Sequence, residues 1–279
     1  MRLAITGAWG QLGRSLQGAL KGHDLFLIDL PEHDITDIAI ISAIANFEPD
    51  LVIHAAAMTD VDGCELDPDS AYNVNALGTQ NVALACQRCD APLLYVSTDY
   101  VFDGDKEEPY LEFDEPNPIS VYGRSKLAGE LVVRSLLNRF HIVRTAWLYS
   151  RGGNNFVNRI LQLAEERKEL SVVSSEVGSP TYAPDLAKAI VRLIEHPLYG
   201  IYHLVNEGSC SRYEFAHKIL ELAGKSSFPL YPAETFDRPA NVPANAVLRN
   251  FCAATQLGIT LRPWEEALRA YFEGRSKAL

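Results

Sequence analysis

The sequence lacks several features that would have assigned the protein to a special class. No apolar run approaches the roughly 20 residues that a helix needs to cross a bilayer, so we expect a protein that does not enter membranes. Basic residues are not in excess, since 25 Lys and Arg stand against 36 Asp and Glu, and the formal net charge is −11. A protein this acidic has no general attraction to nucleic acid, so any anionic ligand must meet local donors.

Cysteine is also scarce. The five cysteines form no regular framework, which argues against a disulfide scaffold and favours a reducing compartment, expected to be the cytoplasm. The first residues enter a strand pattern at once, without the layout of a secretion signal. Cys86 and Cys89 have CxxC spacing, but they lie in an expected helix and have no second pair. We therefore predict buried apolar side chains there and no metal site.

What the sequence does contain is an alternation of short apolar runs and longer helical patterns. Continuous apolar runs, typical of strands buried on both faces, occur at 3–6, 25–29, 51–54, 93–97 and 141–145. Helical patterns fill the gaps, at about 11–20, 36–47, 70–88 and 122–138. This alternation predicts an α/β fold, a doubly wound parallel sheet of the Rossmann type with helices on both faces.

The rhythm changes after Tyr149. Helical patterns are now separated by loops rich in Pro and Gly, and they lie near 155–169, 184–195, 212–222 and 264–272. We therefore expect residues 1–150 to form the Rossmann domain and residues 151–279 to form mainly a smaller, substrate-binding C-terminal lobe. This boundary is soft, because a later strand such as 201–205 could return to the main sheet.

Three glycines with GxxGxxG spacing follow the first expected strand. Gly7, Gly10 and Gly13 stand between that strand and the first helix. Glycine at such a turn lets main-chain N–H groups approach a pyrophosphate at the positive end of the helix, and the last glycine lets helix and strand pack closely. The motif predicts a dinucleotide cofactor, which is NADH or NADPH.

The ends of the second and third strands extend this cofactor site. Asp29 can accept hydrogen bonds from the adenosine ribose, which would favour NADH, or it can be an ordinary loop acid. Small residues after the third strand let a flat cofactor lie against the main chain, whereas His54 before them is expected to be structural. The predicted cofactor-binding residues are Gly7, Gly10, Gln11, Leu12, Gly13, Asp29, Asp34, Ile35, Ala55, Ala56, Ala57, Tyr122 and Lys126.

A second motif carries the chemistry. Tyr122 and Lys126 are four residues apart at the start of an expected helix, so both side chains lie on one face. A tyrosine can deliver a proton to a developing alkoxide, and we expect the lysine ammonium to favour ionisation of the phenol and so lower its pKa. Thr98, at the end of the fourth strand, can hydrogen-bond the same oxygen. We predict that these three residues are catalytic.

These motifs together resemble the extended short-chain dehydrogenase/reductases, and within them the family of dTDP-4-dehydrorhamnose reductases. The matching stretches are GAWGQLG (7–13), HAAAMTDVD (54–62), STDYVFDG (97–104), VYGRSKLAGE (121–130), RTAWLY (144–149), GNNF (153–156) and GSPT (178–181). The resemblance implies NAD(P)H-dependent reduction of the 4-keto group of dTDP-4-dehydro-6-deoxy-L-mannose to dTDP-L-rhamnose. It also implies that Asp99, Tyr100 and Trp147 face the sugar, and it leaves a homodimer open. Sugar-nucleotide dehydratases of the same superfamily usually carry Asp-Glu after the threonine, where this chain has Asp99-Tyr100, so reduction fits better than dehydration.

The chain departs from this family pattern in two places. Near the C-terminus the family commonly carries Arg-Pro-x-x-Ser-x-Leu, but the best local match has Val242 in place of the arginine and Ala246 in place of the serine. Arg238-Pro239 is a second candidate that lies out of register. In addition, the glutamate that links some family members into metal-bridged dimers is Ser15 here.

These departures keep two alternatives open. One is a reductase or epimerase that acts on a different nucleotide sugar. The other is a non-catalytic regulatory subunit, because the chain also resembles the β-subunit of methionine adenosyltransferase, which keeps this fold to bind a cofactor and a partner enzyme. Val242 gives the second alternative some support, whereas the intact Tyr122–Lys126 pair argues against it.

Overall fold

A six-stranded parallel sheet forms the centre of the protein, whose computed structural model describes residues 1–275. The strands lie in the order β10-β5-β4-β3-β1-β2. Their bounds are β1 (Arg2–Thr6), β2 (Asp24–Ile28), β3 (Leu51–His54), β4 (Leu93–Thr98), β5 (Phe140–Thr145) and β10 (Gly200–His203). Thr6 pairs in register with His54, and Thr98 pairs with Thr145, so the strands end at a common carboxyl edge.

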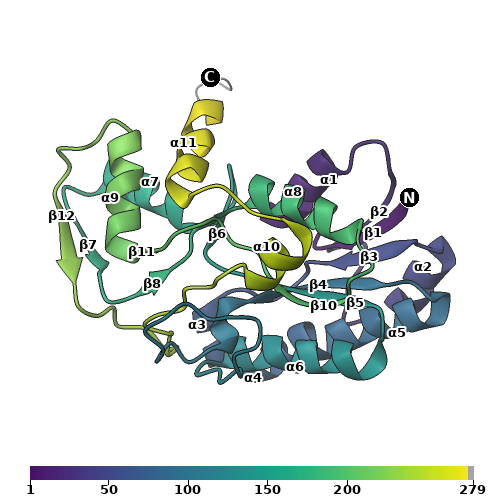
Figure 1. Cartoon of the computed structure of the whole chain (residues 1–279). Coiled ribbons are helices and arrows are strands. Elements are labelled where there is room, and N and C mark those ends of the chain that lie inside the picture. Colours follow the sequence, from purple (N-terminus) through teal and green to yellow (C-terminus); the bar gives the residue numbers. More distant parts are fainter. Residues whose placement is uncertain (276–279) are drawn as a thin grey trace.

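Helices cover both faces of this sheet (Figure 1). One face carries α1 (Gln11–Ala19), α8 (Ala183–Ile194) and α10 (Phe251–Leu257), which share an apolar cluster with the strands. The other face carries α2 (Ala39–Phe47), α5 (Thr79–Cys89) and α6 (Val121–Leu136), which share a second cluster. Two buried layers on one parallel sheet are the doubly wound Rossmann-like arrangement predicted from the sequence, and that prediction is confirmed.

A third apolar cluster holds together the lobe beside the sheet, where α7 (Phe156–Glu166), α9 (Arg212–Leu222) and α11 (Trp264–Arg275) pack (Figure 1). Short strand pairs complete this lobe. They are β7 (Leu170–Val173) with β12 (Leu230–Ala233), β8 (Val177–Gly178) with β11 (Cys210–Ser211), and β6 (Leu148–Tyr149) with β9 (Thr181–Tyr182). The later strand expected to return to the main sheet does so as β10, which pairs with β5. The second half of the chain therefore contributes β10, α8 and α10 to the sheet's layers.

One predicted helix is wrong in detail. Residues 70–88 were expected to form a single helix, but they divide into α4 (Pro68–Tyr72), a π-helical turn η1 (Asn73–Gly78) and α5. Within the turn, Asn75 is fully buried, and its amide hydrogen-bonds the main chain of Met58 and the hydroxyl of Ser125. A π-turn inserts an extra residue, and the contacts that Asn75 makes there compensate for the poorer helical geometry.

Two shorter elements lie near the carboxyl edge of the sheet. They are α3 (Val61–Leu66) and the 3₁₀ turn η2 (Asp99–Val101), which follows β4 directly. Across residues 1–275, no helix combines the length and apolar character needed to cross a bilayer.

Candidate active site

A cavity of about 880 Å³ opens at the carboxyl edge of the sheet. Every residue predicted from the sequence as catalytic, cofactor-binding or substrate-binding lines this cavity. Its walls come from the turn after β1, the ends of β2, β3 and β4, the start of α6 and the segment after β5. Ligands of open α/β sheets bind at this edge, so the location itself marks a site.

The glycine turn is shaped for a close main-chain approach. Gly7 has φ +68°, and a β-carbon on it would lie 2.7 Å from the amide nitrogen of Ala56. A β-carbon on Gly13 would collide with the main-chain carbonyl of Gly7. Both positions therefore exclude any side chain, and the N-terminus of α1 faces the cavity with no acidic residue in its first turn. This arrangement fits the pyrophosphate of a dinucleotide.

The Asp29 carboxylate accepts hydrogen bonds from two main-chain amides, one of them in this turn. Its Oδ2 accepts a hydrogen bond from the amide of Trp9 at 2.7 Å, and its Oδ1 accepts one from Leu30 at 2.9 Å. Asp34 and Ile35 line the same end of the cavity, and the Asp34 carboxylate caps the amide and hydroxyl of Thr36. Asp29 thus stabilises the glycine turn as well as bordering the cavity.

The residues at the end of β3 lie where the sequence indicated, with small side chains at the cavity and the histidine behind them. Ala55, Ala56 and Ala57 line the cavity with little bulk, whereas His54 is fully buried behind them. The His54 ring hydrogen-bonds the hydroxyls of Thr6 and Thr79, and burial, with a contribution from Lys126, lowers its pKa to about 3. His54 is a neutral structural residue, as expected.

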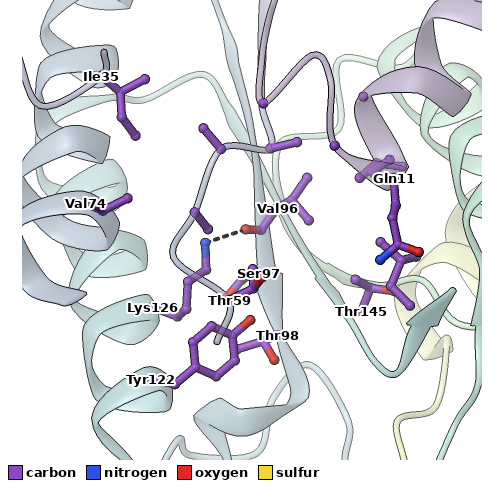
Figure 2. A pocket seen from close by; sticks show the side chains of 18 of the residues that line it. Gln11, Ile35, Thr59, Val74, Val96, Ser97, Thr98, Tyr122, Lys126 and Thr145 are labelled. Carbon is purple, nitrogen blue, oxygen red and sulfur yellow. Dashed lines mark hydrogen bonds between the residues drawn. The ribbon is translucent and has the colours of Figure 1, made fainter. Parts of the chain in front are cut away.

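Tyr122 and Lys126 both enter the cavity from the first turns of α6 (Figure 2). The hydroxyl of Ser120 caps this helix by accepting a hydrogen bond from the amide of Gly123 at 3.1 Å. Lys126 Nζ donates a hydrogen bond to the carbonyl oxygen of Val96 at 2.8 Å. Figure 2 shows the Tyr122 ring beside Thr98 and Ser97, below the Lys126 ammonium.

The sequence predicted a lowered pKa for the Tyr122 phenol, and for the protein without a bound cofactor this prediction is wrong. Burial raises the pKa of its phenol, because the charged form loses solvation, and hydrogen bonding by Thr98 lowers it only in part. Burial also lowers the pKa of the Lys126 ammonium to about 7, with the nearby Glu130 carboxylate acting against this shift. The sequence argument considered the attraction between the two groups and omitted the cost of desolvating them.

A buried ion pair supports this helix from behind. Glu130, one turn after Lys126, accepts two hydrogen bonds from the Arg144 guanidinium at 2.9 and 2.7 Å, and a third at 2.5 Å from Ser97. The side chains of Glu130 and Arg144 are 0% and 1% exposed. The pair joins α6 to the ends of β4 and β5, so it holds the helix that carries Tyr122 against the sheet.

The residues after β4 form the floor of the cavity. Thr98 donates a hydrogen bond to Asp99 Oδ1 at 2.9 Å, and the Tyr100 ring packs edge-on against Tyr122. Burial raises the pKa of the Asp99 carboxyl to about 7, and Asp99 Oδ2 has no hydrogen-bond partner within the described chain. Asp99 lines the cavity, so this buried oxygen is an unsatisfied acceptor at the cavity wall.

Trp147 occupies a strained position at the opposite wall. Its φ is +44°, in the left-handed region that bulky residues rarely adopt, and its ring packs tightly against Gly178. The guanidinium carbon of Arg212, the first residue of α9, lies 3.5 Å from the centre of the Trp147 ring. The Arg212 guanidinium thus covers one face of the Trp147 ring. Arg212 also lines the cavity.

Sequence reasoning missed several residues that line the cavity. They are Trp9, Ile28, Leu30, His33, Thr36, Thr59, Val61, Asn73, Val74, Val96, Ser97, Thr145, Ala146, Leu148, Asn154 and Arg212. Ser97 and Thr145 stand beside predicted positions at strand ends, so the location of the carboxyl edge could have indicated them. Nothing in the spacing indicated Arg212, because only the packing of α9 within the lobe and of its guanidinium on Trp147 brings it there.

The second half of the chain is also tied to the glycine turn. Gln11 Oε1 accepts hydrogen bonds from the Ser150 hydroxyl at 3.0 Å and from the Asn155 amide at 2.9 Å. Asn155 belongs to the GNNF stretch and caps α7. These contacts explain why that stretch stands beside the cofactor motif in the fold.

The remaining sequence features have structural explanations. Cys86 is buried in α5, as predicted, whereas Cys89 is only partly buried and donates a hydrogen bond to the carbonyl of Ala85 within the helix. Within residues 1–275, no group of three or more His, Cys, Asp or Glu side chains is placed to hold a metal ion. Val242 packs against a small cluster that includes Tyr100 and Tyr122, while Arg238 is paired with Asp62.

Comparisons with known proteins agree with this architecture. Residues 1–276 match the family described as RmlD substrate binding domain. The spore coat polysaccharide biosynthesis protein SpsK of Bacillus subtilis is 41% identical, with 99% of each chain covered. Two solved structures of dTDP-4-dehydrorhamnose reductases are similar. That from Clostridium acetobutylicum is 42% identical, covers 99% of this chain and 100% of its own, and has a TM-score of 0.96. That from Bacillus anthracis, solved in complex with NADP, is 44% identical, covers 98% and 99%, and has a TM-score of 0.94.

The parallel sheet, the glycine turn and the Tyr-x-x-x-Lys helix define an extended short-chain dehydrogenase/reductase. Within that class, the chain belongs to the RmlD substrate-binding-domain family, which matches almost its entire length.

Proposed function

We propose that this chain reduces the 4-keto group of dTDP-4-dehydro-6-deoxy-L-mannose to dTDP-L-rhamnose, with NADPH or NADH as the reductant. One observation carries the proposal. Tyr122 and Lys126 enter the same cavity that the glycine turn borders, so an acid and a dinucleotide cradle share one chamber. Family membership and the likeness to reductases over the whole chain support the same activity.

The roles of the side chains follow from their chemistry. The nicotinamide cofactor, when bound, supplies hydride to the keto carbon. Tyr122, whose raised pKa keeps the phenol protonated, donates its proton to the keto oxygen. The Thr98 hydroxyl, which donates to Asp99 Oδ1 in the structure, turns its hydrogen bond to the same keto oxygen when substrate is bound and stabilises the charge that develops there. Lys126 holds the nicotinamide ribose, and the carbonyl of Val96 orients its ammonium.

The cofactor and sugar occupy different walls in this proposal. The glycine turn, Gln11, Leu12 and the alanines after β3 bind the dinucleotide. Asp29, Asp34 and Ile35 border its adenosine end. Asp99, Tyr100 and Trp147 contact the sugar, with Asp99 Oδ2 accepting a hydrogen bond from a sugar hydroxyl. The nucleotide sugar is the proposed ligand of this cavity. The cytoplasm is the proposed location, because all five cysteines are free thiols.

The direct test is turnover by the purified chain. It is supplied with dTDP-4-dehydro-6-deoxy-L-mannose and either NADPH or NADH, and the oxidation of the reductant is followed by absorbance. The product is identified by nuclear magnetic resonance and is expected to be dTDP-L-rhamnose. Absence of turnover with both reductants would contradict the proposal.

A second candidate is reduction of a different nucleotide sugar. The specific observation in its favour is Val242, which replaces the arginine of the family pattern with an apolar side chain that packs against the cluster containing Tyr100 and Tyr122. The same assay with 4-keto sugars on other nucleotides, and with dTDP-4-keto-6-deoxy-D-glucose, separates the two candidates by their kcat/KM. A non-catalytic subunit would instead turn over none of these substrates and would purify with a partner enzyme.

A further inference from the structure

The substrate of the proposed function carries a diphosphate, and its two negative charges need donors in this acidic protein. Arginine is well suited because its planar guanidinium donates paired hydrogen bonds to phosphate oxygens. The family pattern places an arginine where this chain has Val242, and the Val242 side chain packs in an apolar cluster with Tyr100 and Tyr122. Another residue must therefore provide the charge.

Lysine and arginine are rare in the cavity wall. Among the residues that line it, all of which lie in the described part of the chain, only Lys126 and Arg212 carry such a side chain. Lys126 donates to the carbonyl of Val96 and lies 4.2 Å from the centre of the Tyr95 ring, deep beside the proposed acid. Arg212 is thus the cation left for a substrate anion.

Arg212 is held in place without using up its donors. Its guanidinium stacks on Trp147, and its side chain is 18% exposed. Its only ion-pair partner within residues 1–275 is Glu176, at 3.5 Å from Nε, and no side-chain hydrogen bond joins them. Stacking orients the plane of the guanidinium, and most of its N–H groups stay available to a ligand.

Arg212 also lies on the side of the cavity where the sugar is proposed to bind. Its positive charge lowers the pKa of Asp99 and of Tyr100, although burial dominates the shift of each group. Val242 packs against the cluster that contains Tyr100 and Tyr122. The position of the absent arginine and the position of Arg212 therefore lie on the same side of the cavity.

Arg238 is the competing arginine, and its contacts argue against it. Nε and one terminal nitrogen of Arg238 donate to the two carboxylate oxygens of Asp62 at 2.9 and 3.1 Å. This bidentate pair offsets the charge and uses two of the N–H donors, and Arg238 does not line the cavity, although its charge also lowers the pKa of Tyr100. It fastens the loop before Val242 to α3.

We infer that Arg212 is the residue that binds the diphosphate of the nucleotide-sugar substrate, in place of the arginine replaced by Val242. This inference rests on the proposed function and adds a specificity-determining residue to it. A guanidinium stacked on Trp147 would bind the phosphates with one edge while the sugar extends toward Asp99 and Tyr122.

The test compares Arg212→Ala with the unaltered chain in binding dTDP, thymidine and NADPH, each by titration calorimetry. Removal of charge-assisted hydrogen bonds is expected to weaken dTDP binding roughly 10- to 100-fold. Thymidine has no phosphate and NADPH binds at the glycine turn, so the affinities for both are expected to stay within about twofold of the unaltered chain. Unchanged NADPH binding also shows that the variant is folded.

Two further variants keep the result specific. Lys218→Ala removes one positive charge from the same helix outside the cavity and is expected to leave dTDP binding unchanged. Arg238→Ala tests the competing arginine. The inference is overturned if Arg212→Ala weakens thymidine binding as much as dTDP binding, or if it abolishes NADPH binding. It is also overturned if Arg238→Ala is the variant that weakens dTDP binding and leaves thymidine binding unchanged.

Failure of the proposed function gives a different result. An unaltered chain that binds NADPH but none of dTDP, UDP and GDP would overturn both the proposed function and this inference. If the unaltered chain prefers UDP or GDP over dTDP, the nucleotide of the proposed function is wrong. The assignment of Arg212 is then judged by the same comparison of that diphosphate with its nucleoside.

Discussion

The two ends of the cavity differ in which atoms form their walls. The end proposed to bind the cofactor is main chain and small side chains, since glycines 7, 10 and 13 and the alanines after β3 form its surface. The end proposed to bind the substrate is made of large or charged side chains, chiefly Asp99, Tyr100, Trp147 and Arg212. A wall of main chain binds what every member of such a fold shares, whereas a wall of side chains is free to vary with the substrate.

The two ends also depend on different contacts. The glycine turn needs only that no β-carbon intrudes, as the positions of Gly7 and Gly13 show. The substrate end needs four separate segments to meet, because Asp99, Trp147, Gly178 and Arg212 are distant in sequence. Substitutions should therefore affect the cofactor or the sugar, and seldom both.

The largest effect is expected at the junction of the two ends, from Tyr122→Phe. Loss of the proton donor should lower kcat by roughly 10²- to 10⁴-fold. Binding of NADPH, measured by fluorescence titration, should change by less than about twofold, because the ring and its packing against Tyr100 are kept. A variant with nearly unaltered kcat would show that another group donates the proton.

Gly13→Ala tests the cofactor end. The new β-carbon would collide with the main-chain carbonyl of Gly7, so the turn must shift, at a cost of about 1–3 kcal/mol in stability. NADPH affinity should fall by at least about tenfold, while thymidine affinity should not change. Calorimetry measures both.

The same helix offers a matched control. Among the described residues, no atom outside the adjoining turns of α1 lies within 4 Å of a β-carbon built on Gly18, so Gly18→Ala should stabilise α1 by about 0.5–1 kcal/mol and leave cofactor binding intact. Equal losses of NADPH affinity in both variants would mean that the geometry of the turn is not what binds the cofactor.

The dependence of activity on pH tests the junction between the two ends. Burial lowers the pKa of Lys126 to about 7, so the ammonium that we propose holds the cofactor ribose is present below that pH and is lost above it. kcat/KM for keto reduction should therefore be flat at low pH and fall as the pH rises through about 7, approaching tenfold per unit.

Asp99 titrates in the same range, because burial raises its pKa to about 7. In Asp99→Asn the fall in kcat/KM should persist, since Lys126 is unchanged. If the profile of this variant is flat instead, the titrating group is Asp99 and the role given to Lys126 is wrong.

Gly178→Ala tests the substrate end and should have the smallest effect. A β-carbon there would lie 2.5 Å from the Trp147 ring, which must move and carry the stacked Arg212 with it. KM for the nucleotide sugar should rise by roughly fivefold, which corresponds to about 1 kcal/mol of lost binding, and KM for NADPH should not change. Equal increases in both KM values would show that the two ends are not independent.

The difference between the ends also explains what the sequence could predict. Strands of the main sheet are continuous apolar runs, and all five expected in the first half are present within one residue at each end. The glycine turn and the Tyr122–Lys126 face are set by local spacing, so their presence at one cavity follows from chain order and the rule of the carboxyl edge. The catalytic roles of these residues stay predictions.

The sequence could not predict what depends on tertiary packing. The π-turn at 73–78 follows from the buried contacts of Asn75 with Met58 and Ser125, which no periodicity reveals. Arg212 was seen only as the first residue of a helix. The pKa of Tyr122 depends on burial, which a linear motif does not state, and so the direction of its shift was wrong.

The carboxylate of Asp29 has a practical consequence for anyone who wishes to exchange one nicotinamide cofactor for the other. Replacing an acid at the end of β2 is an obvious way to admit a 2′-phosphate. Here the same replacement would release the amides of Trp9 and Leu30, which depend on that carboxylate. Redesign of cofactor choice in this enzyme must therefore begin by finding those two amides a new acceptor.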